Sequence, residues 1–120
     1  MQILKIIVVD DHASVREGLR AFLDSQSDLE VVGAVSNGND VLTILNSGFE
    51  AEVLLTDYYM PVIDGLELIR QALSIRPSLK VIMLSTHPMK SLKEKALAAG
   101  AKACLDKKGD LRELLAAIRA

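Results

Sequence analysis

Aromatic residues and cysteine are scarce in this sequence, and each shortage excludes a class of structure or function. The 120 residues include no tryptophan, two tyrosines and two phenylalanines. The core must therefore be aliphatic, and the shortage of aromatic rings argues against a surface on which the bases of single-stranded nucleic acid stack. Cys104 is the only cysteine, which rules out an internal disulfide and a zinc site built on cysteine thiolates.

Strong charge of one sign and long apolar runs are also missing. The net charge is −2 and no block is rich in lysine and arginine, which argues against a nucleic-acid-binding domain. No apolar run approaches the roughly 18 residues of a membrane span, and the N-terminus lacks the layout of a signal peptide. We therefore expect a cytoplasmic protein without membrane contact, folded as one domain over residues 1–120.

Apolar runs alternate with helical patterns along the chain. Short apolar runs predict five strands, at residues 3–9, 30–35, 52–56, 80–85 and 102–106. Hydrophobic spacing and helix start signals predict five helices, at residues 13–25, 39–47, 64–75, 88–99 and from 110 onward. This alternation predicts an α/β fold with a parallel five-stranded sheet that helices cover on both faces.

Several predicted helices carry start and stop signals. Segments 64–67 and 110–113 each place a glutamate three residues after an aspartate, the pattern of a capping box that opens a helix. Asn37 or Asn39 is suited to cap the second helix, and Gly48 is suited to end it.

Three aspartates follow two of the predicted strands. Asp10 and Asp11 come directly after the run 6–9, and Asp57 follows the run 53–56. If the two strands are parallel neighbours, all three carboxylates meet at one edge of the sheet. Holding them within about 4–6 Å is strongly unfavourable unless a cation neutralises them or one is modified.

Two further polar residues lie at strand ends: Ser85 is the last residue of the fourth predicted strand, and Lys107 follows the fifth. Ligands of open parallel sheets gather at this edge, where the strand order reverses. Asp10 and Asp11 are hard oxygen donors that suit Mg²⁺. Asp57 can be a third ligand and a nucleophile that forms an acyl phosphate. With Lys107 and Ser85 contacting phosphoryl oxygens, the set predicts transfer of a phosphoryl group to Asp57.

Four segments carry a specific pattern: residues 8–12 (VVDDH), 57–65 (DYYMPVIDG), 81–85 (VIMLS) and 106–107 (DK). Together they resemble the receiver (CheY-like) domain of two-component response regulators, over essentially all 120 residues. The start of the pattern and residues 84–87 most resemble the LuxR-type (NarL/FixJ) subfamily. The resemblance implies a flavodoxin-like three-layer (βα)5 sandwich with the strand order 2-1-3-4-5.

The resemblance also implies a role for each site residue. Asp57 matches the phosphoacceptor, and Asp10 and Asp11 match the acidic pair that binds Mg²⁺, with Mn²⁺ as a substitute and Asp11 as the more direct ligand. The backbone carbonyl of Tyr59 matches the third protein ligand. Ser85 matches the switch hydroxyl of the family, and Lys107 matches its lysine.

Partners follow from the resemblance as well. It implies a sensor histidine kinase as phosphoryl donor, and an output through the fourth helix, fifth strand and fifth helix or through a homodimer. LuxR-type regulators usually carry a C-terminal helix-turn-helix domain, which these 120 residues do not contain. We therefore expect contact with DNA, and control of transcription, only through such a domain. The last helical pattern is still amphipathic at Ala120, so we expect the natural chain to continue.

The sequence departs from the family pattern at four positions. Cys104 stands where many members have an aromatic switch residue, so an aromatic–hydroxyl relay is not expected. Lys108 replaces a common proline after the lysine. Tyr59 and His87 occupy the two positions that tune dephosphorylation, and both are bulky. We hypothesise that they obstruct the attacking water and make the acyl phosphate long-lived.

Several single residues also have simpler interpretations. We expect His12 to be a loop or helix-start histidine rather than a metal ligand, and His87 to be exposed. Cys104 is most simply a small, semi-buried strand residue. Ser85 is favoured over its neighbour Thr86 as the switch hydroxyl because of its spacing from Lys107.

Three other functions remain as alternatives. A pseudo-receiver would be an interaction module that never gains phosphate, although no site residue is missing. An aspartyl-phosphate hydrolase would need an acidic residue where Tyr59 stands, so we expect no turnover of outside substrates. The only reactions that we expect the domain to catalyse are its own phosphorylation and dephosphorylation. A flavin binder would share the fold, but Asp10 and Asp11 would repel the phosphate of the flavin.

Overall fold

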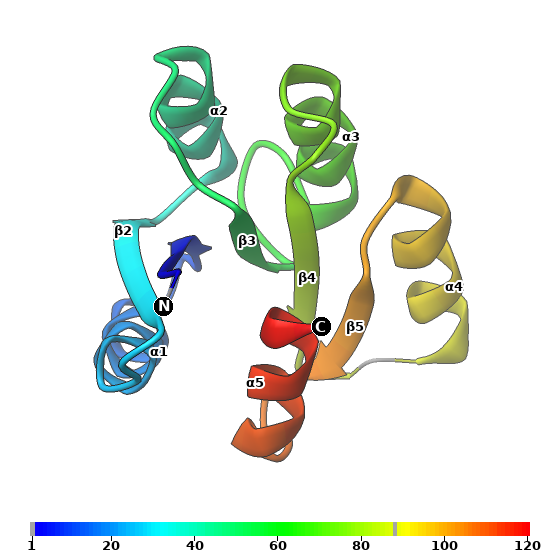
Figure 1. The fold of residues 1–120 in the computed structure, drawn as a ribbon. Helices are drawn as coiled ribbons and strands as arrows, with labels where there is room; N and C mark the ends of the chain where they lie inside the picture. Colours follow the sequence, from blue (N-terminus) through cyan, green and yellow to red (C-terminus); the bar gives the residue numbers. More distant parts are fainter. Residues whose placement is uncertain (1, 88) are drawn as a thin grey trace.

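Five strands alternate with five helices along the chain (Figure 1). The computed structural model describes residues 2–87 and 89–120. The elements are β1 (Leu4–Val9), α1 (Ala13–Asp24), β2 (Leu29–Val35), α2 (Gly38–Asn46), β3 (Val53–Asp57), α3 (Gly65–Ile75), β4 (Lys80–Ser85), α4 (Lys90–Ala99), β5 (Ala103–Asp106) and α5 (Leu111–Arg119). The predicted elements agree with these bounds to within one residue, except that the predicted start of α4, at residue 88, lies outside the described residues.

The sheet is parallel and has the order β2-β1-β3-β4-β5, as the resemblance implied. Val9 pairs with Thr56, so the residues that follow these two positions, Asp10 and Asp57, leave neighbouring strands at the same edge. The chain turns to opposite sides of β1 when it forms β2 and β3. That reversal of strand order is where parallel α/β sheets place their functional sites.

Helices cover both faces of the sheet and bury alternate residues of each central strand. On β1, Ile7 and Val9 belong to the core cluster under α2, α3 and α4, whereas Ile6 and Val8 belong to the cluster under α1 and α5. Side chains of a strand point alternately to the two faces. A strand buried on both faces must therefore be apolar throughout, which explains the continuous apolar runs of the sequence.

Two of the predicted helix caps form as expected. The side chain of Asn37 accepts a hydrogen bond from the backbone N–H of Asp40, at 2.9 Å, and opens α2. The side chain of Asp64 accepts from the backbone N–H of Glu67, also at 2.9 Å, and opens α3. Gly48 follows α2 with a φ of +82°, a conformation that glycine adopts without strain.

The capping box predicted at 110–113 forms differently. The Asp110 carboxylate accepts from the backbone N–H of Arg112 at 2.8 Å, not from that of Glu113. The guanidinium of Arg112 also pairs with this carboxylate, at 2.9 Å, which holds the carboxylate toward the second residue of α5. At α3, the carboxylate of Glu67 is used by the side chain of Gln71. Neither glutamate is therefore seen returning to its aspartate among the described contacts.

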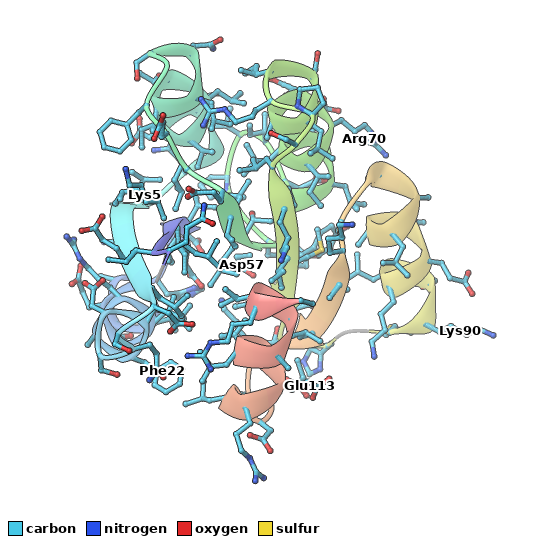
Figure 2. All side chains as sticks on the ribbon, in the orientation of Figure 1. Lys5, Phe22, Asp57, Arg70, Lys90 and Glu113 are labelled. Carbon is cyan, nitrogen blue, oxygen red and sulfur yellow. The ribbon has the colours of Figure 1, made fainter. Side chains whose placement is uncertain are left out.

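Long-range contacts fix the end of α5 against the sheet. Lys80 of β4 donates from Nζ to the carbonyl of Ile118 at 2.9 Å. Arg119 makes two 2.8 Å hydrogen bonds to the carboxylate of Asp28, in the loop before β2. Figure 2 shows the charged side chains of Lys90 and Glu113 at the periphery of the molecule, whereas Asp57 lies in its interior. None of the helices in the described part of the chain is long and apolar enough to cross a bilayer.

Candidate functional site

Three strand ends bring two buried carboxylates and an ammonium together. Asp57 ends β3 and Asp10 follows β1, and these side chains are almost fully buried. Lys107 follows β5 and places its Nζ 2.7 Å from Asp10 Oδ2 and 3.0 Å from Asp57 Oδ2. The lysine therefore bridges the two carboxylates at the edge of the sheet that the sequence indicated.

Burial and pairing act on these groups in opposite directions. Burial raises the pKa of the Asp57 carboxyl, and the hydrogen bond and charge of Lys107 reduce that rise without cancelling it. Burial alone would lower the pKa of the Lys107 ammonium, but its bonds to Asp10 and Asp57 outweigh burial and raise it. The site thus holds a poorly hydrated carboxylate oxygen next to a fixed positive charge, an arrangement suited to nucleophilic attack on an anionic group.

Asp11 and His12 complete the acidic cluster from the start of α1. Asp10 Oδ1 accepts a hydrogen bond from the backbone N–H of His12 at 2.8 Å. The His12 Nδ1 atom lies 3.2 Å from Asp11 Oδ1 and 3.3 Å from Asp10 Oδ1. One ligand atom each from Asp10, Asp11, His12 and Asp57 lies within 4.8 Å of the other three.

The charges of the cluster fit a divalent cation. Three carboxylates and the ammonium of Lys107 leave two negative charges when His12 is neutral, and the carboxylate oxygens are the ligands that Mg²⁺ prefers. Asp11 is partly exposed, which gives an ion a route from solvent. The residues present therefore fit the Mg²⁺ ion that the sequence led us to expect.

Ser85 and Thr86 differ in burial. Ser85, at the end of β4, is buried, and its Oγ accepts from the backbone N–H of His87 at 3.2 Å. Thr86 is exposed. The backbone N–H of Lys107 donates to the carbonyl of Ser85 at 2.9 Å, which ties the ends of β4 and β5 together. The buried position beside Lys107 favours Ser85 over Thr86 as the hydroxyl of the site.

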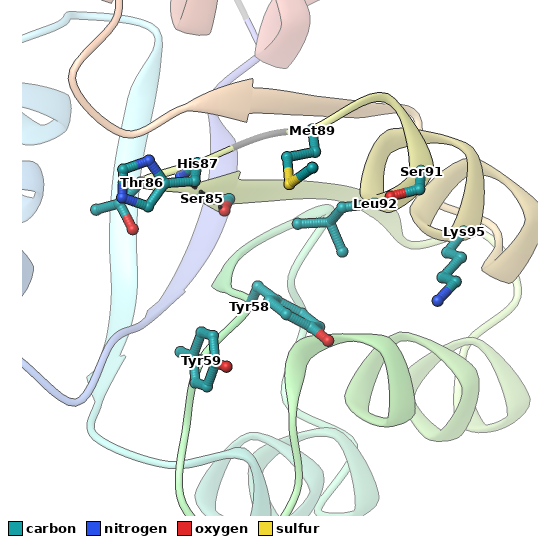
Figure 3. A pocket seen from close by; sticks show the side chains of 9 residues that line it. All are labelled: Tyr58, Tyr59, Ser85, Thr86, His87, Met89, Ser91, Leu92 and Lys95. Atoms are coloured by element: carbon teal, nitrogen blue, oxygen red, sulfur yellow. Dashed lines mark hydrogen bonds between the residues drawn. The ribbon is translucent and has the colours of Figure 1, made fainter.

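The bulky residues Tyr59 and His87 lie on opposite walls of a groove beside the site. Figure 3 shows Tyr58 and Tyr59 on the β3–α3 side and His87 on the β4–α4 side. The groove has a volume of about 260 Å³. Tyr59 is 81% exposed and packs edge-to-face on Tyr58, with ring centroids 5.3 Å apart. His87 is exposed, as expected.

Cys104 lies deeper than the semi-buried position that we expected. It is buried in the core cluster under α4. Burial raises the pKa of its thiol, and the charge of Lys93 opposes that rise. A buried protonated thiol is unreactive, which fits a packing role on β5.

Three supporting residues were not predicted from the sequence. Arg16 of α1 donates to the backbone carbonyl of Asp10 at 2.8 Å and so fixes the loop after β1. A Cβ on Gly65 would lie 2.5 Å from the carbonyl oxygen of Asp57, so the loop can return to the acceptor only without a side chain there. Val62 has a φ of +74°. The aspartate-to-glycine end of segment 57–65 was a signal for Gly65, whereas nothing in the sequence pointed to Arg16 or Val62.

Comparison with known proteins agrees with this geometry. The family model described as "Response regulator receiver domain" matches residues 6–119. The chain belongs to this family. It functions as the receiver domain of a two-component response regulator.

Individual relatives support the same assignment. UhpA, a transcriptional regulatory protein of Escherichia coli (strain K12), is 37% identical over 115 residues, which are 96% of this chain and 57% of UhpA. The response regulator UvrY from the same strain is 35% identical over 116 residues, which are 97% of this chain and 53% of UvrY. The receiver domain thus spans about half the length of the curated relatives it matches. These relatives are consistent with the LuxR-type resemblance.

A solved structure has the same fold. The isolated receiver domain of RcsB from Salmonella enterica serovar Typhimurium, in the presence of the phosphomimetic BeF3−, superposes with a TM-score of 0.87 at 29% identity. The match covers 98% of this chain and 89% of that chain. The receiver fold of this chain is therefore established by sequence and by structure.

Proposed function

We propose that this receiver domain accepts one phosphoryl group on Asp57 from a sensor histidine kinase, with Mg²⁺ as cofactor and Mn²⁺ as a substitute. The observation that carries the proposal is the Lys107 ammonium, which lies 2.7 Å from Asp10 and 3.0 Å from Asp57. The Lys107 ammonium is held at the acceptor carboxylate. One of its N–H groups can therefore donate to a phosphoryl oxygen when the bond between Asp57 and phosphorus forms.

The chemistry is an in-line displacement. An Asp57 carboxylate oxygen forms a bond to phosphorus, the bond from phosphorus to the imidazole nitrogen of the kinase breaks, and that nitrogen keeps the electron pair. Lys107 then contacts one phosphoryl oxygen and the Ser85 hydroxyl donates to another. Asp10, Asp11 and the backbone carbonyl of Tyr59 would hold Mg²⁺, which when bound neutralises charge on the phosphoryl oxygens.

The proposed output is a change in which surfaces the domain presents. A phosphoryl group on Asp57 would draw Ser85 and Lys107 toward it, and the packed ends of β4 and β5 would choose between two arrangements. The α4–β5–α5 face, or a homodimer through terminal helices, would transmit the change. Since the curated relatives are about twice as long, we propose a cytoplasmic regulator that controls transcription through a C-terminal helix-turn-helix domain on DNA.

Two features of the site bear on how long the phosphoryl group stays. Tyr59 and His87 face the groove beside the acceptor, and we propose that they restrict the approach of the attacking water. Cys104 offers no aromatic ring for a relay, so the motion of Ser85 would have to reach α4 through backbone contacts. No acidic residue stands two positions after Asp57, so hydrolysis of outside phosphate esters is not part of the proposal.

Phosphorylation with a small donor tests the proposal directly. We expect acetyl phosphate with Mg²⁺ to add the mass of one phosphoryl group to the intact protein, and chelation of Mg²⁺ or the substitution Asp57→Asn to abolish the gain. Asp24→Asn is the matched control, because Asp24 lies on the far side of the domain and its oxygen acceptor for Val31 is retained. Labelling of Asp57→Asn would refute the assignment, and an unlabelled wild type would leave a pseudo-receiver.

A further inference from the structure

We propose that His12 contributes a nitrogen ligand to the cation site, so that this receiver domain binds Ni²⁺ or Co²⁺ more tightly than Mg²⁺. The inference rests on the divalent-cation site of the proposed function and concerns which ions that site selects. His12 is not needed by the phosphoryl transfer described above. Its ring nevertheless lies beside the carboxylates of Asp10 and Asp11, a placement that the proposed phosphoryl transfer does not use.

The backbone fixes His12 at the site. His12 is the N-cap residue of α1 in an extended conformation, with φ −91° and ψ 112°, and its side chain makes no capping hydrogen bond. Its backbone N–H donates to Asp10 Oδ1 at 2.8 Å. The expectation of a helix-start histidine is thus correct for the backbone. The ring does not cap the helix, and its Nδ1 atom is instead in hydrogen-bond contact with Asp10 Oδ1 at 3.3 Å.

The distances around the His12 ring match those between neighbouring ligands of one ion. Ligands at about 2.1 Å from an octahedral ion lie about 3.0 Å apart when adjacent and about 4.2 Å apart when opposite. The Nδ1 atom lies 3.2 Å from Asp11 Oδ1 and 3.3 Å from Asp10 Oδ1. The widest separation in the group, within 4.8 Å, closes with small rotations of the partly exposed Asp11 and the exposed His12.

The two carboxylate oxygens of Asp10 have different partners. Its Oδ2 atom pairs with Lys107, and its Oδ1 atom faces His12. An ion on the His12 side therefore does not compete with the lysine for the same oxygen. Asp57 likewise offers its second oxygen, because only Oδ2 is held by Lys107.

Imidazole nitrogen changes which ions the site prefers. Mg²⁺ takes oxygen ligands and keeps several waters, whereas Co²⁺, Ni²⁺ and Zn²⁺ bind imidazole well, with affinity rising along the first-row series toward copper. A site of three carboxylates alone would favour these ions only moderately. One added nitrogen ligand from His12 raises their affinity and leaves that of Mg²⁺ nearly unchanged.

Metal titration of the full chain tests the inference. Tyr58 and Tyr59 are the only tyrosines and tryptophan is absent, so tyrosine fluorescence reports on ions bound next to Asp57. We expect Ni²⁺ to bind with a Kd at least about tenfold below that of Mg²⁺, and His12→Asn to weaken Ni²⁺ binding about tenfold. The Kd for Mg²⁺ should change by less than about threefold in the same variant, because Mg²⁺ does not use the ring.

His87→Asn is the matched control, since His87 is the second of the two histidines and is also exposed. It should leave both Kd values unchanged. Equal loss of Ni²⁺ and Mg²⁺ affinity in His12→Asn would overturn the inference, since the ring would then act only as a hydrogen-bond partner of the carboxylates. No loss of Ni²⁺ affinity would overturn it as well.

Pulsed electron paramagnetic resonance of bound Mn²⁺ gives a direct readout. A nitrogen coupling should be present in the wild type and in His87→Asn, and absent in His12→Asn. The result is separable from the proposed function. A domain that binds Ni²⁺ through His12 but takes no phosphoryl group keeps the metal inference and loses the function. A domain phosphorylated on Asp57 without nitrogen coupling does the reverse.

Discussion

At the scale of the single residue, Val62 has a strained backbone conformation. Its φ of +74° places a β-branched side chain in the left-handed region, which costs on the order of 1–2 kcal/mol for residues other than glycine. The side chain is 87% exposed, so packing does not compensate for the strain. The loop that follows the acceptor therefore holds its shape at the expense of stability.

Relief of this strain is the first prediction. Val62→Gly should raise the free energy of unfolding by about 0.5–1 kcal/mol, because the relief of the left-handed strain exceeds the added flexibility of glycine. Urea denaturation measures the change. Val62→Ala is the control, since it removes the branch but keeps Cβ, and it should gain less. A Val62→Gly protein less stable than the wild type would contradict the strained conformation.

Gly65 shows the opposite constraint. A Cβ at this position would lie 2.5 Å from the Asp57 carbonyl oxygen and 2.9 Å from Met83 Cε. Gly65→Ala should therefore destabilise the domain by about 1–3 kcal/mol through displacement of backbone, and slow phosphorylation of Asp57 by acetyl phosphate.

Gly18 offers a matched control for that substitution. It lies in α1, and a Cβ added there would meet nothing within 4 Å, so Gly18→Ala should stabilise the domain by about 0.5–1 kcal/mol through helix propensity. Urea midpoints of both variants would be compared with the wild type. Similar effects of the two substitutions would show that the close approach at Gly65 is not the cause.

At the scale of elements, α5 depends on contacts with distant parts of the chain. Arg119 lowers the pKa of Asp28 below its usual value of 3.8 through their side-chain hydrogen bonds. A carboxylate whose folded pKa is depressed contributes stability above its unfolded pKa and loses it as the pH falls through the folded pKa. The pairing is solvent-exposed, so its contribution is modest and screened by salt.

Arg119→Ala should therefore lower stability at pH 5–7, and the difference from the wild type should shrink as the pH falls below about 3.8. Urea denaturation at several pH values measures this difference. Arg20→Ala is the control, because Arg20 only approaches Asp24 at 4.0 Å on one helix. A difference that grows toward acid would contradict the contribution of the Asp28 carboxylate.

The helix caps show how well a local sequence pattern predicts where a helix begins. Asn37 and Asp64 cap their helices because each side chain reaches a backbone N–H three residues ahead, a contact that depends on local spacing alone. Asp110 was predicted by the same rule, but the guanidinium of Arg112 draws its carboxylate to a nearer N–H. A local pattern is thus reliable until a charged neighbour offers the same oxygen a second partner.

At the scale of the whole molecule, the buried Cys104 reports on global opening. Its thiol lies in the core cluster under α4, and burial raises its pKa. We expect a thiol reagent such as dithionitrobenzoate to label the native domain at least about 100-fold more slowly than the urea-unfolded chain, because labelling requires a costly opening.

Urea below the unfolding transition should raise this rate in step with the loss of stability. Cys104→Ser supplies the background rate, and the single cysteine makes the signal unambiguous. Rapid labelling of the native domain, independent of urea, would show instead that β5 opens locally while the rest of the sheet stays folded.

The sequence by itself determined the elements and the edge at which the carboxylates meet. Continuous apolar runs indicate parallel strands buried on both faces, and the residues after parallel strands share one edge of the sheet. The position of Asp10 and Asp57 at that edge could therefore be predicted from the order of the elements. Cys104 was placed on a strand for the same reason, although its depth was not evident.

The tertiary structure alone decided how the site is arranged. Lys107 bridges the carboxylates of Asp10 and Asp57, and the Nδ1 atom of His12 lies beside oxygens of Asp10 and Asp11. These facts depend on rotamers and loop paths that neighbours from other strands select, because each side chain is placed by charges and contacts far away in the sequence. Local spacing carries no record of such partners, and it therefore could not decide them.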